Sequence, residues 1–461
     1  MGAAKESSRK KSIIDWSDES GVEIEFDRIR RFKPFEHGSV VFGGLFGDEG
    51  KGKKVDELAE SYKSKGLKVL SIRGQGSGNA GHTVVVDGVK YDFHYLTSAG
   101  LSADIMLLGP GMLVDPIRVL KEAEKLPEEK RKIIMVAERA TIVTDVDRAM
   151  DSWCENQRFA SGQKVIGTTK SGVGPGAGNR GYRVHITFAD ALQCKNAQEL
   201  RTLALKNPIL PDEVREILTR EYSIELWEAI NKLNIVDSNV VIANCRNEGN
   251  WAILLEVSQA IGLDPLFGNG GHFTTSTPCT DIGGAAGAGL TMKDFPDGCT
   301  MMLKAYASKV GGGPFITKFS DDEKHIDKFI DDMVGEHGVT TGRKRELGWF
   351  DGPAVRYAIE LTGAKICINC MDVIAELPKI TDHIKVCFAY QNKWTGEVTY
   401  DWPYNLYDYR PLYASMSFVG LSKEEIIKRY IVMIEAVMGQ TISGFGVGPS
   451  RKDYRKRIEA I

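Results

Sequence analysis

The chain has 461 residues, of which 42% are hydrophobic and 26% are charged, a balance typical of a globular protein with a sizeable core. A formal net charge of -3 provides no basic field, so nucleic acid and anionic membranes are not expected as its main partners. Eight scattered cysteines indicate reduced thiols, and with no bilayer-length apolar run and no secretory signal the cytoplasm is the expected location.

The chain is expected to consist of an extension followed by one folded body. Residues 1–37 are polar and charged and show little periodicity, which favours a solvated tail. Residues 38–461 contain no internal repeat and no linker rich in Pro, Gly or Ser. We expect them to form a single domain with smaller subdomains added to it.

The body is predicted to open with a βαβ unit. The apolar run 39–42 ends at Gly43, which predicts a strand that leads into a loop. Apolar residues then recur at helical spacing from Lys53, and an apolar run over 67–72 predicts the second strand.

Strands and helices are predicted to alternate along the rest of the body. This order is typical of an α/β fold with a large, mainly parallel central sheet covered by helices. The further strands are predicted over 105–108, 133–136, 240–243 and 365–368, and the clearest helices over 116–126 and 423–438.

The loop after the first strand is predicted to bind phosphate in the manner of a P-loop. It reads Gly-Gly-Leu-Phe-Gly-Asp-Glu-Gly-Lys-Gly-Lys over 43–53, where backbone N–H groups and a helix dipole can face an anion. It does not match the P-loop pattern by letter, because no glycine lies five residues before Gly50 and Gly52 replaces the magnesium-binding Ser or Thr. Asp48 would repel phosphate, so we expect it to hold a metal or to accept a proton.

The second strand also ends in a glycine-rich polar segment, residues 73–83. Open α/β sheets bind ligands at this carboxyl edge, so His82 could donate to an oxygen on which charge develops. A hydrogen-bonded structural histidine is the simpler interpretation of His82 alone. Its pairing with the Asp48 loop favours catalysis.

These two segments resemble the signatures of the adenylosuccinate synthetase family. Residues 47–53 read Gly-Asp-Glu-Gly-Lys-Gly-Lys and residues 79–83 read Asn-Ala-Gly-His-Thr. The resemblance covers most of 38–450, and it continues through 166–169, 304–306, 310–315, 340–345 and 348–349.

The resemblance implies a homodimeric carbon–nitrogen ligase of purine biosynthesis and salvage. In that family GTP phosphorylates O6 of IMP, and the amine of L-aspartate then displaces the phosphate to give adenylosuccinate. The chemistry is reasonable, because phosphorylation turns a poor leaving group into a good one. By resemblance, Asp48 is the base that takes the N1 proton and a ligand of Mg²⁺ together with the Gly81 carbonyl, and His82 is the acid that stabilises O6.

The family's binding residues can be carried over position by position. GTP would be bound by Gly47, Glu49, Gly50, Lys51, Gly52, Lys53, Gly81, Thr83, Arg345, Asp372, Gly446 and Gly448. IMP would be bound by Asp48, Lys51, Asn79, Ala80, Gly81, His82, Thr169, Arg180, Trp251, Thr275 and Arg343. Aspartate would be bound by Val339, Thr340, Thr341, Gly342, Arg343 and Arg345, whose guanidinium groups suit a dicarboxylate.

Several positions depart from the family pattern. Cys370 replaces a lysine beside the guanine site, so selectivity for GTP rests on Asp372, which can accept from guanine N1 and N2. Arg180 is the candidate for the arginine lent across the dimer interface. Trp251 stands where the family has a glutamine near the purine O6, so either the alignment slips here or the pocket is rebuilt.

Two alternative functions stay open. The first is a ligase that uses GMP or dGMP, as in a related viral branch that lacks the loop aspartate, and Asp48 argues against it. The second is a catalytically silent nucleotide-binding paralogue. Retention of the proton-transfer and anion-binding groups argues against that hypothesis, since a silent protein has no need of Asp48, Lys51, His82, Arg343 and Arg345.

Overall fold

The computed structural model describes residues 32–86, 88–269, 271–338 and 342–457. The chain divides into two compact units, Met1–Pro34 and Phe35–Ile461, and every element below belongs to the second. The expected extension therefore falls almost entirely outside the described residues, as do Val339, Thr340 and Thr341 of the expected aspartate-binding stretch.

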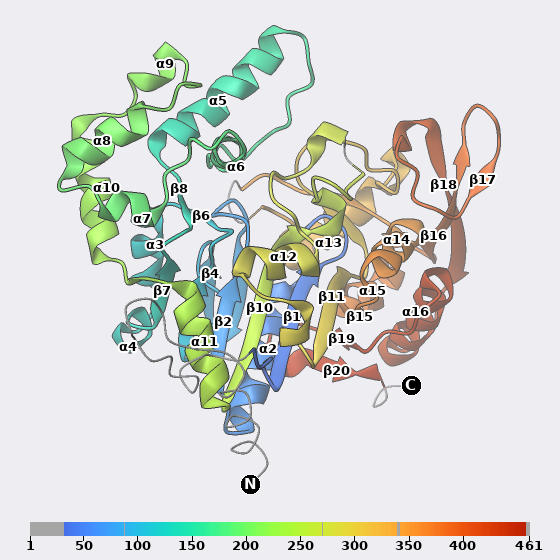
Figure 1. The fold of residues 1–461 in the computed structure, drawn as a ribbon. Coiled ribbons are helices and arrows are strands. Elements are labelled where there is room, and N and C mark those ends of the chain that lie inside the picture. The colour runs from blue at the N-terminus through green and yellow to red at the C-terminus, as the bar shows by residue number, and fades with distance from the viewer. Residues whose placement is uncertain (1–31, 87, 270, 339–341, 458–461) are drawn as a thin grey trace, which may run out of the picture. The chain divides into compact units, whose positions relative to one another are not determined.

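Ten strands form one central sheet, in which every neighbouring pair is parallel except β19 and β20 at one edge (Figure 1). The expected large, mainly parallel sheet is confirmed. Its order is β20 (Tyr454–Lys456), β19 (Gly444–Gly446), β15 (Lys365–Asn369), β11 (Gly298–Lys304), β1 (His37–Gly43), β10 (Trp251–Ala260), β2 (Lys68–Arg73), β5 (Ile105–Leu108), β7 (Ile134–Ala137) and β9 (Ile235–Val236).

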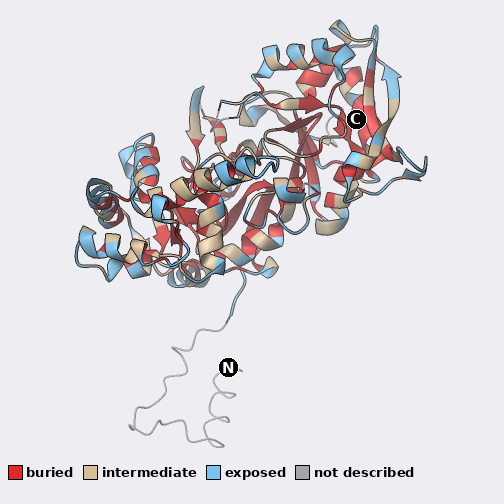
Figure 2. Ribbon diagram, turned by 90° about the horizontal axis from the view of Figure 1, so that it is seen from above, coloured by how far each residue is buried: buried red, intermediate tan, exposed pale blue. Residues whose placement is uncertain are grey.

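The sheet is buried on both faces, as Figure 2 shows for its central strands. Alternate residues of β10 belong to opposite cores: Ile253 and Leu255 share a cluster with α12 (Asp281–Ala288), and Leu254 shares one with α2 (Lys51–Ser64). This two-sided burial explains why the strands read as continuous apolar runs. Helices α2, α12 and α11 (Ser238–Glu248) contact β10, and α15 (Met371–Glu376) contacts β19. Three further helices are α3 (Pro116–Ala123), α14 (Gly352–Thr362) and α16 (Lys423–Met438).

Smaller pieces are added around this sheet. A helical region between β8 (Thr141–Ile142) and β9 holds α5 (Asp145–Ala160), α6 (Val173–Gly181), α7 (Phe188–Leu192), α8 (Ala197–Leu205), α9 (Asp212–Arg215) and α10 (Arg220–Lys232). The short helix α4 (Glu128–Arg131) lies before β7. The short strand pairs are β3 (His82–Val86) with β4 (Val89–Phe93), β6 (Leu113–Val114) with β8 (Thr141–Ile142), and β12 (Ala307–Lys309) with β13 (Glu346–Gly348). The other sheet contains β14 (Phe350–Asp351), β16 (His383–Asn392), β17 (Val398–Thr399) and β18 (Tyr409–Ser417), and α13 (Lys324–Val334) precedes β13. No helix in the described part of the chain has the length and apolar character needed to cross a membrane.

Most predicted elements are confirmed, but the strand predicted over 240–243 is wrong. That run lies inside α11, which begins after Asp237, whose carboxylate caps the helix by accepting from the Asn239 amide at 2.9 Å. A short apolar run can belong to a strand or to a helix, and here the cap and the helix-ending Gly249 decide for the helix. The sequence interpretation missed β10, immediately after this helix, and also β9, β11, β19 and β20 of the central sheet.

Candidate active site

The loop that links β1 to α2 is held in shape by its own polar groups. Gly47, Asp48 and Gly50 have positive φ angles of 92°, 60° and 77°, conformations that glycine and aspartate tolerate well. The Glu49 carboxylate accepts from the amides of Leu45 and Gly47 at 3.2 and 2.7 Å. The loop is therefore already folded back on itself before any phosphate arrives.

The start of α2 packs too closely to accept a Ser or Thr at the P-loop magnesium position. A Cβ on Gly52 would lie 2.8 Å from the Ser98 hydroxyl and 3.1 Å from the Thr83 carbonyl oxygen. Asp48 offers a carboxylate in place of the hydroxyl of a Ser or Thr, because its side chain is 38% exposed and lines the cavity. Carboxylate oxygens suit Mg²⁺, so the residues fit the metal that the sequence predicts.

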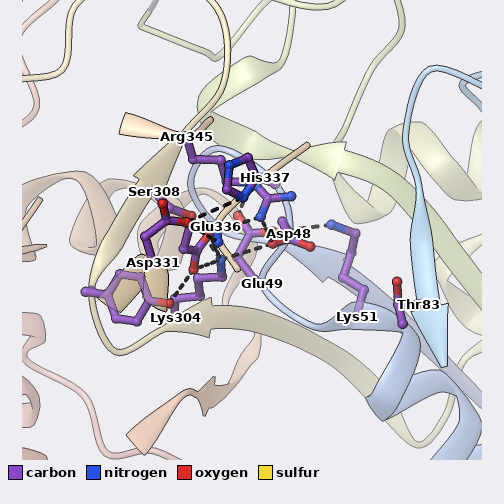
Figure 3. A network of polar contacts seen from close by, with 12 residues as sticks. Asp48, Glu49, Lys51, Thr83, Lys304, Ser308, Asp331, Glu336, His337 and Arg345 are labelled. Carbon is purple, nitrogen blue, oxygen red and sulfur yellow. Dashed lines mark hydrogen bonds and ion pairs between the residues drawn. The ribbon is translucent and has the colours of Figure 1, made fainter. Parts of the chain in front are cut away.

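Asp48 lies in a network of two cations and a second carboxylate (Figure 3). Lys304 Nζ is 3.0 Å from its carboxylate and Arg345 Nη1 is 2.7 Å away, and both cations also bind Glu336. Burial raises the pKa of Asp48, but the charges of Lys304 and Arg345 outweigh it and lower the pKa below its ordinary value. Asp48 is therefore ionised at neutral pH and able to accept a proton or a metal ion.

His82 begins β3 and is oriented by Glu256 from the centre of β10. Its Nδ1 is hydrogen-bonded to the Glu256 carboxylate, which also accepts from the amide and the hydroxyl of Ser98, both at 2.7 Å. Burial raises the pKa of Glu256, but His82, Arg73 and the Ser98 amide lower it to about 2. Burial lowers the pKa of His82 below its ordinary value, and the Glu256 charge opposes this change only in part. Within the described residues His82 Nε2 has no hydrogen-bond partner, so it is the atom available to a ligand.

These groups meet in a cavity of about 530 Å³ at the carboxyl edge of the sheet. That volume is in the range that small-molecule sites occupy. Its lining includes eleven of the residues expected to bind substrates, namely Gly47, Asp48, Lys51, Asn79, Ala80, Gly81, His82, Thr169, Thr275, Arg343 and Arg345.

A second group of expected residues gathers beside the start of α2, outside this cavity lining. Lys53 Nζ donates to the Gly448 carbonyl at 2.7 Å, and a Cβ on Gly446 would lie 2.8 Å from the same nitrogen. Burial lowers the pKa of Lys53 below its ordinary value, and the charges of Asp453, Cys370 and Asp372 oppose this change. Asp372 therefore lies near enough to Lys53 to affect its pKa. The residues assigned to GTP thus come together from three distant parts of the chain.

The described part of the aspartate-binding stretch lies against the segment that carries Thr169. Arg343 Nη1 donates to the Gly167 carbonyl at 2.9 Å. The amides of Ile166 and Gly167 are held in turn by the Glu155 carboxylate of α5, at 3.2 and 3.0 Å. The expected aspartate and IMP sites are therefore adjacent.

Comparisons with known proteins give the same assignment as the site. The family model for adenylosuccinate synthetase matches residues 40–455. The chain belongs to the adenylosuccinate synthetase family. An adenylosuccinate synthetase of Caldanaerobacter subterraneus subsp. tengcongensis is 33% identical over 90% of this chain and 98% of that protein. One of Caldicellulosiruptor bescii is 34% identical with the same coverage.

Solved structures support the fold of the family. A fully ligated adenylosuccinate synthetase from Plasmodium falciparum matches with a TM-score of 0.80 and 28% identity, over 91% of this chain and 99% of that chain. A cyanophage S-2L succinoaminodeoxyadenylate synthetase, bound to dGMP and dATP, has a TM-score of 0.59 and 17% identity over 92% of this chain and 95% of its own. The viral enzyme shares the fold, and the synthetase match is the stronger one.

Trp251 does not lie in the purine pocket, contrary to expectation. It is the first residue of β10 and pairs with Lys68 at the start of β2, and its indole nitrogen donates to Glu248 at 2.7 Å. Gln259 lies eight residues further along the strand, roughly 26 Å away at about 3.3 Å per residue. Gln259 lines the cavity and its amide donates to Asn79 at 3.0 Å. Gln259 therefore lies at the cavity end of β10, and Trp251 lies at the opposite end of the same strand.

Two other expected residues bind within their own chain. The Arg180 guanidinium donates to the carbonyls of Gly111 and Met112 at 3.2 and 3.1 Å, and to the Thr141 hydroxyl at 2.8 Å. These contacts hold it away from the cavity lining, so its transfer to a partner subunit stays an untested prediction. The Thr83 hydroxyl donates to Asp92 at 2.6 Å, and Thr83 contributes its carbonyl to the packing of α2.

Four residues of the site were absent from the sequence prediction: Glu256, Gln259, Lys304 and Glu336. Glu256 and Gln259 could have been found, because both interrupt a long apolar run and burying a polar group is costly unless it is used. Lys304 belongs to a segment that resembles the family, but its contact with Asp48 arises only in the fold. Glu336 carries no sequence signal, since its partners become neighbours only in the fold.

Proposed function

We propose that the cavity at the carboxyl edge of the sheet is where this chain joins L-aspartate to IMP at the expense of GTP. This ligation, through a 6-phosphoryl-IMP, is the reaction of the adenylosuccinate synthetase family, which uses Mg²⁺ and forms homodimers. The products are adenylosuccinate, GDP and phosphate. The observation that supports this placement is the convergence of Asp48, His82 and Arg345 on one cavity.

Asp48 is suited to take the N1 proton of IMP. Removal of that proton places negative charge on O6, which can then attack the γ-phosphate of GTP. Lys51 and the amides at the start of α2 can stabilise charge on the transferred group. Asp48 would also hold Mg²⁺, and the bound ion would neutralise charge on the phosphate oxygens.

His82 is suited to stabilise the same oxygen from the other side. Its Nε2 has no hydrogen-bond partner among the described residues while Glu256 holds Nδ1, so the Nε2–H of the protonated ring can donate to O6 as negative charge develops. In the second half of the reaction the amine of aspartate attacks C6 and the phosphate leaves with O6. Arg343 and Arg345 can bind the carboxylates of aspartate during this step.

Asp372 is proposed to select guanine, supported by its position beside Lys53 and the Gly446–Gly448 segment. Guanine presents two N–H donors to a carboxylate, and adenine has no such pair. The cytoplasm is proposed as the location, because IMP and GTP are available there. An acceptor other than IMP is the remaining alternative, and the presence of Asp48 favours IMP.

The assignment is tested with purified protein, Mg²⁺ and aspartate. IMP, GMP and dGMP are each supplied with GTP or with ATP, and purine absorbance and phosphate release are followed. We expect product only with IMP, GTP and aspartate together. A preference for dGMP would overturn the choice of acceptor, and no turnover with any combination would indicate a silent paralogue.

The charge of Lys304 predicts how the pH profile responds to mutation. Lys304 lowers the pKa of Asp48, so Lys304→Met should raise that pKa. Because Asp48 must be ionised to accept a proton, the acid limb of kcat/KM for IMP should move to higher pH in the variant. In the native protein the acid limb should lie at lower pH, below the ordinary pKa of a carboxyl group, and profiles of both proteins from about pH 3 to 9 check this. An unchanged acid limb would remove Asp48 as the titrating base.

A further inference from the structure

Glu336 is a buried carboxylate that shares both of its cations with Asp48. Its oxygens lie 2.7 and 2.9 Å from Lys304 Nζ and 3.0 Å from Arg345 Nη1, and it accepts from the Tyr306 hydroxyl. The two carboxylates therefore flank the same pair of cations, as Figure 3 shows. Glu336 has no role in the proton transfer and substrate binding proposed for Asp48, His82 and the arginines.

The carboxylates of Glu336 and Asp48 differ in how far their side chains can move. The Glu336 side chain is 3% exposed, whereas that of Asp48 is 38% exposed. The backbone also fixes Glu336, because its amide donates to Asp331 at 2.9 Å and its carbonyl accepts from the Arg345 amide at 2.8 Å. Asp48 can thus turn toward a ligand in the cavity, while Glu336 stays with the cations.

The charges of the cluster explain why a second carboxylate is needed. Lys304 and Arg345 are balanced by Asp48 and Glu336 in the absence of substrates. When Asp48 accepts a proton or binds Mg²⁺, its attraction for the two cations weakens. Without Glu336 the buried Lys304, whose side chain is 7% exposed, would then have no carboxylate partner, and a buried unpaired charge is strongly unfavourable.

We propose that Glu336 is a positioning residue that keeps Lys304 and Arg345 in place and so allows Asp48 to exchange them for substrate and metal. The proposal rests on the proposed role of Asp48. It predicts that loss of the Glu336 charge leaves Asp48 as the only carboxylate of the cluster, held by two cations. Asp48 would then bind metal poorly even though it is unchanged itself.

The test is Glu336→Gln, with Asp332→Asn as the matched control. Asp332 is an exposed carboxylate of α13 that pairs with Lys328, so the control removes the same charge from the same region. We expect kcat to fall about 10²-fold and the Mg²⁺ concentration for half-maximal rate to rise about tenfold. Calorimetric binding of Mg²⁺ in the presence of IMP and GDP should weaken by a similar factor without turnover. The control should match the native protein in both measurements.

A charge-balanced variant separates this proposal from a loss of structure. Glu336→Gln combined with Lys304→Met removes one anion and one cation, so Mg²⁺ binding should recover most of the lost affinity. Glu336→Asp, which keeps the charge, should lose less affinity than Glu336→Gln. Unchanged Mg²⁺ binding in Glu336→Gln, or no recovery in the double variant, would overturn the proposal. An active Asp48→Asn variant would instead overturn the proposed role of Asp48 as the base. The Mg²⁺ affinities of the Glu336 variants would still test whether Glu336 supports metal binding.

Discussion

Replacement of Asp48 by Asn is expected to abolish ligation while the fold is retained. The amide cannot accept the N1 proton and is a weak ligand for Mg²⁺, so kcat should fall by at least about 10³-fold. Asparagine tolerates the positive φ of 60° at this position, and Lys304 and Arg345 keep Glu336 as a partner. Steady-state kcat with saturating IMP, GTP and aspartate measures the effect, and thermal unfolding confirms that the variant is folded.

A carboxylate nearby on α2 provides the control for this prediction. Glu57 is 30% exposed and pairs with Lys54 at 2.6 Å, so Glu57→Gln removes a comparable charge without touching the cavity. We expect kcat within about twofold of the native value, as for most surface substitutions. An Asp48→Asn protein that keeps more than a tenth of native activity would show that another group takes the proton.

The local part of the site was predictable because its signals are local. The apolar run of β1, the glycines after it and the helical spacing from Lys53 fall within about 25 consecutive residues, so sequence periodicity and glycine placement suffice. Asp48 was recognisable because a carboxylate is out of place in a phosphate-binding loop. The strand, the loop and the helix that carry Asp48 were therefore predictable from residue types alone.

The network around Asp48 was not predictable in the same way. Lys304 is 256 residues away from Asp48 in sequence, and it becomes a neighbour because β1 and β11 pair in parallel and end at the same edge. The error at Trp251 has the same origin, since only the register of β10 against β2 shows which end of the strand faces the cavity. Residue spacing near a motif does not determine strand register when the strand itself is not recognised.

Glu256→Gln is the second substitution expected to have a large effect. The variant keeps the size of the side chain but removes the negative charge that favours protonated His82. We expect kcat to fall about 10²- to 10³-fold near neutral pH, with little change in KM for IMP. Because the charge of Glu256 raises the pKa of His82, its loss should lower that pKa. The alkaline limb of kcat, where His82 loses its proton, should therefore move to lower pH.

Glu122→Gln distinguishes this effect from the cost of altering any buried carboxylate. Glu122 is also buried and accepts from the backbone amides of His94, Tyr95 and Leu96, but it does not line the cavity. Its replacement should lower the melting temperature and leave the alkaline limb in place. If Glu256 acts through His82, adding Glu256→Gln to His82→Asn should reduce kcat little further, because groups that act as a unit are not additive. Two fully additive losses would mean that Glu256 serves the reaction by a route that does not pass through the imidazole.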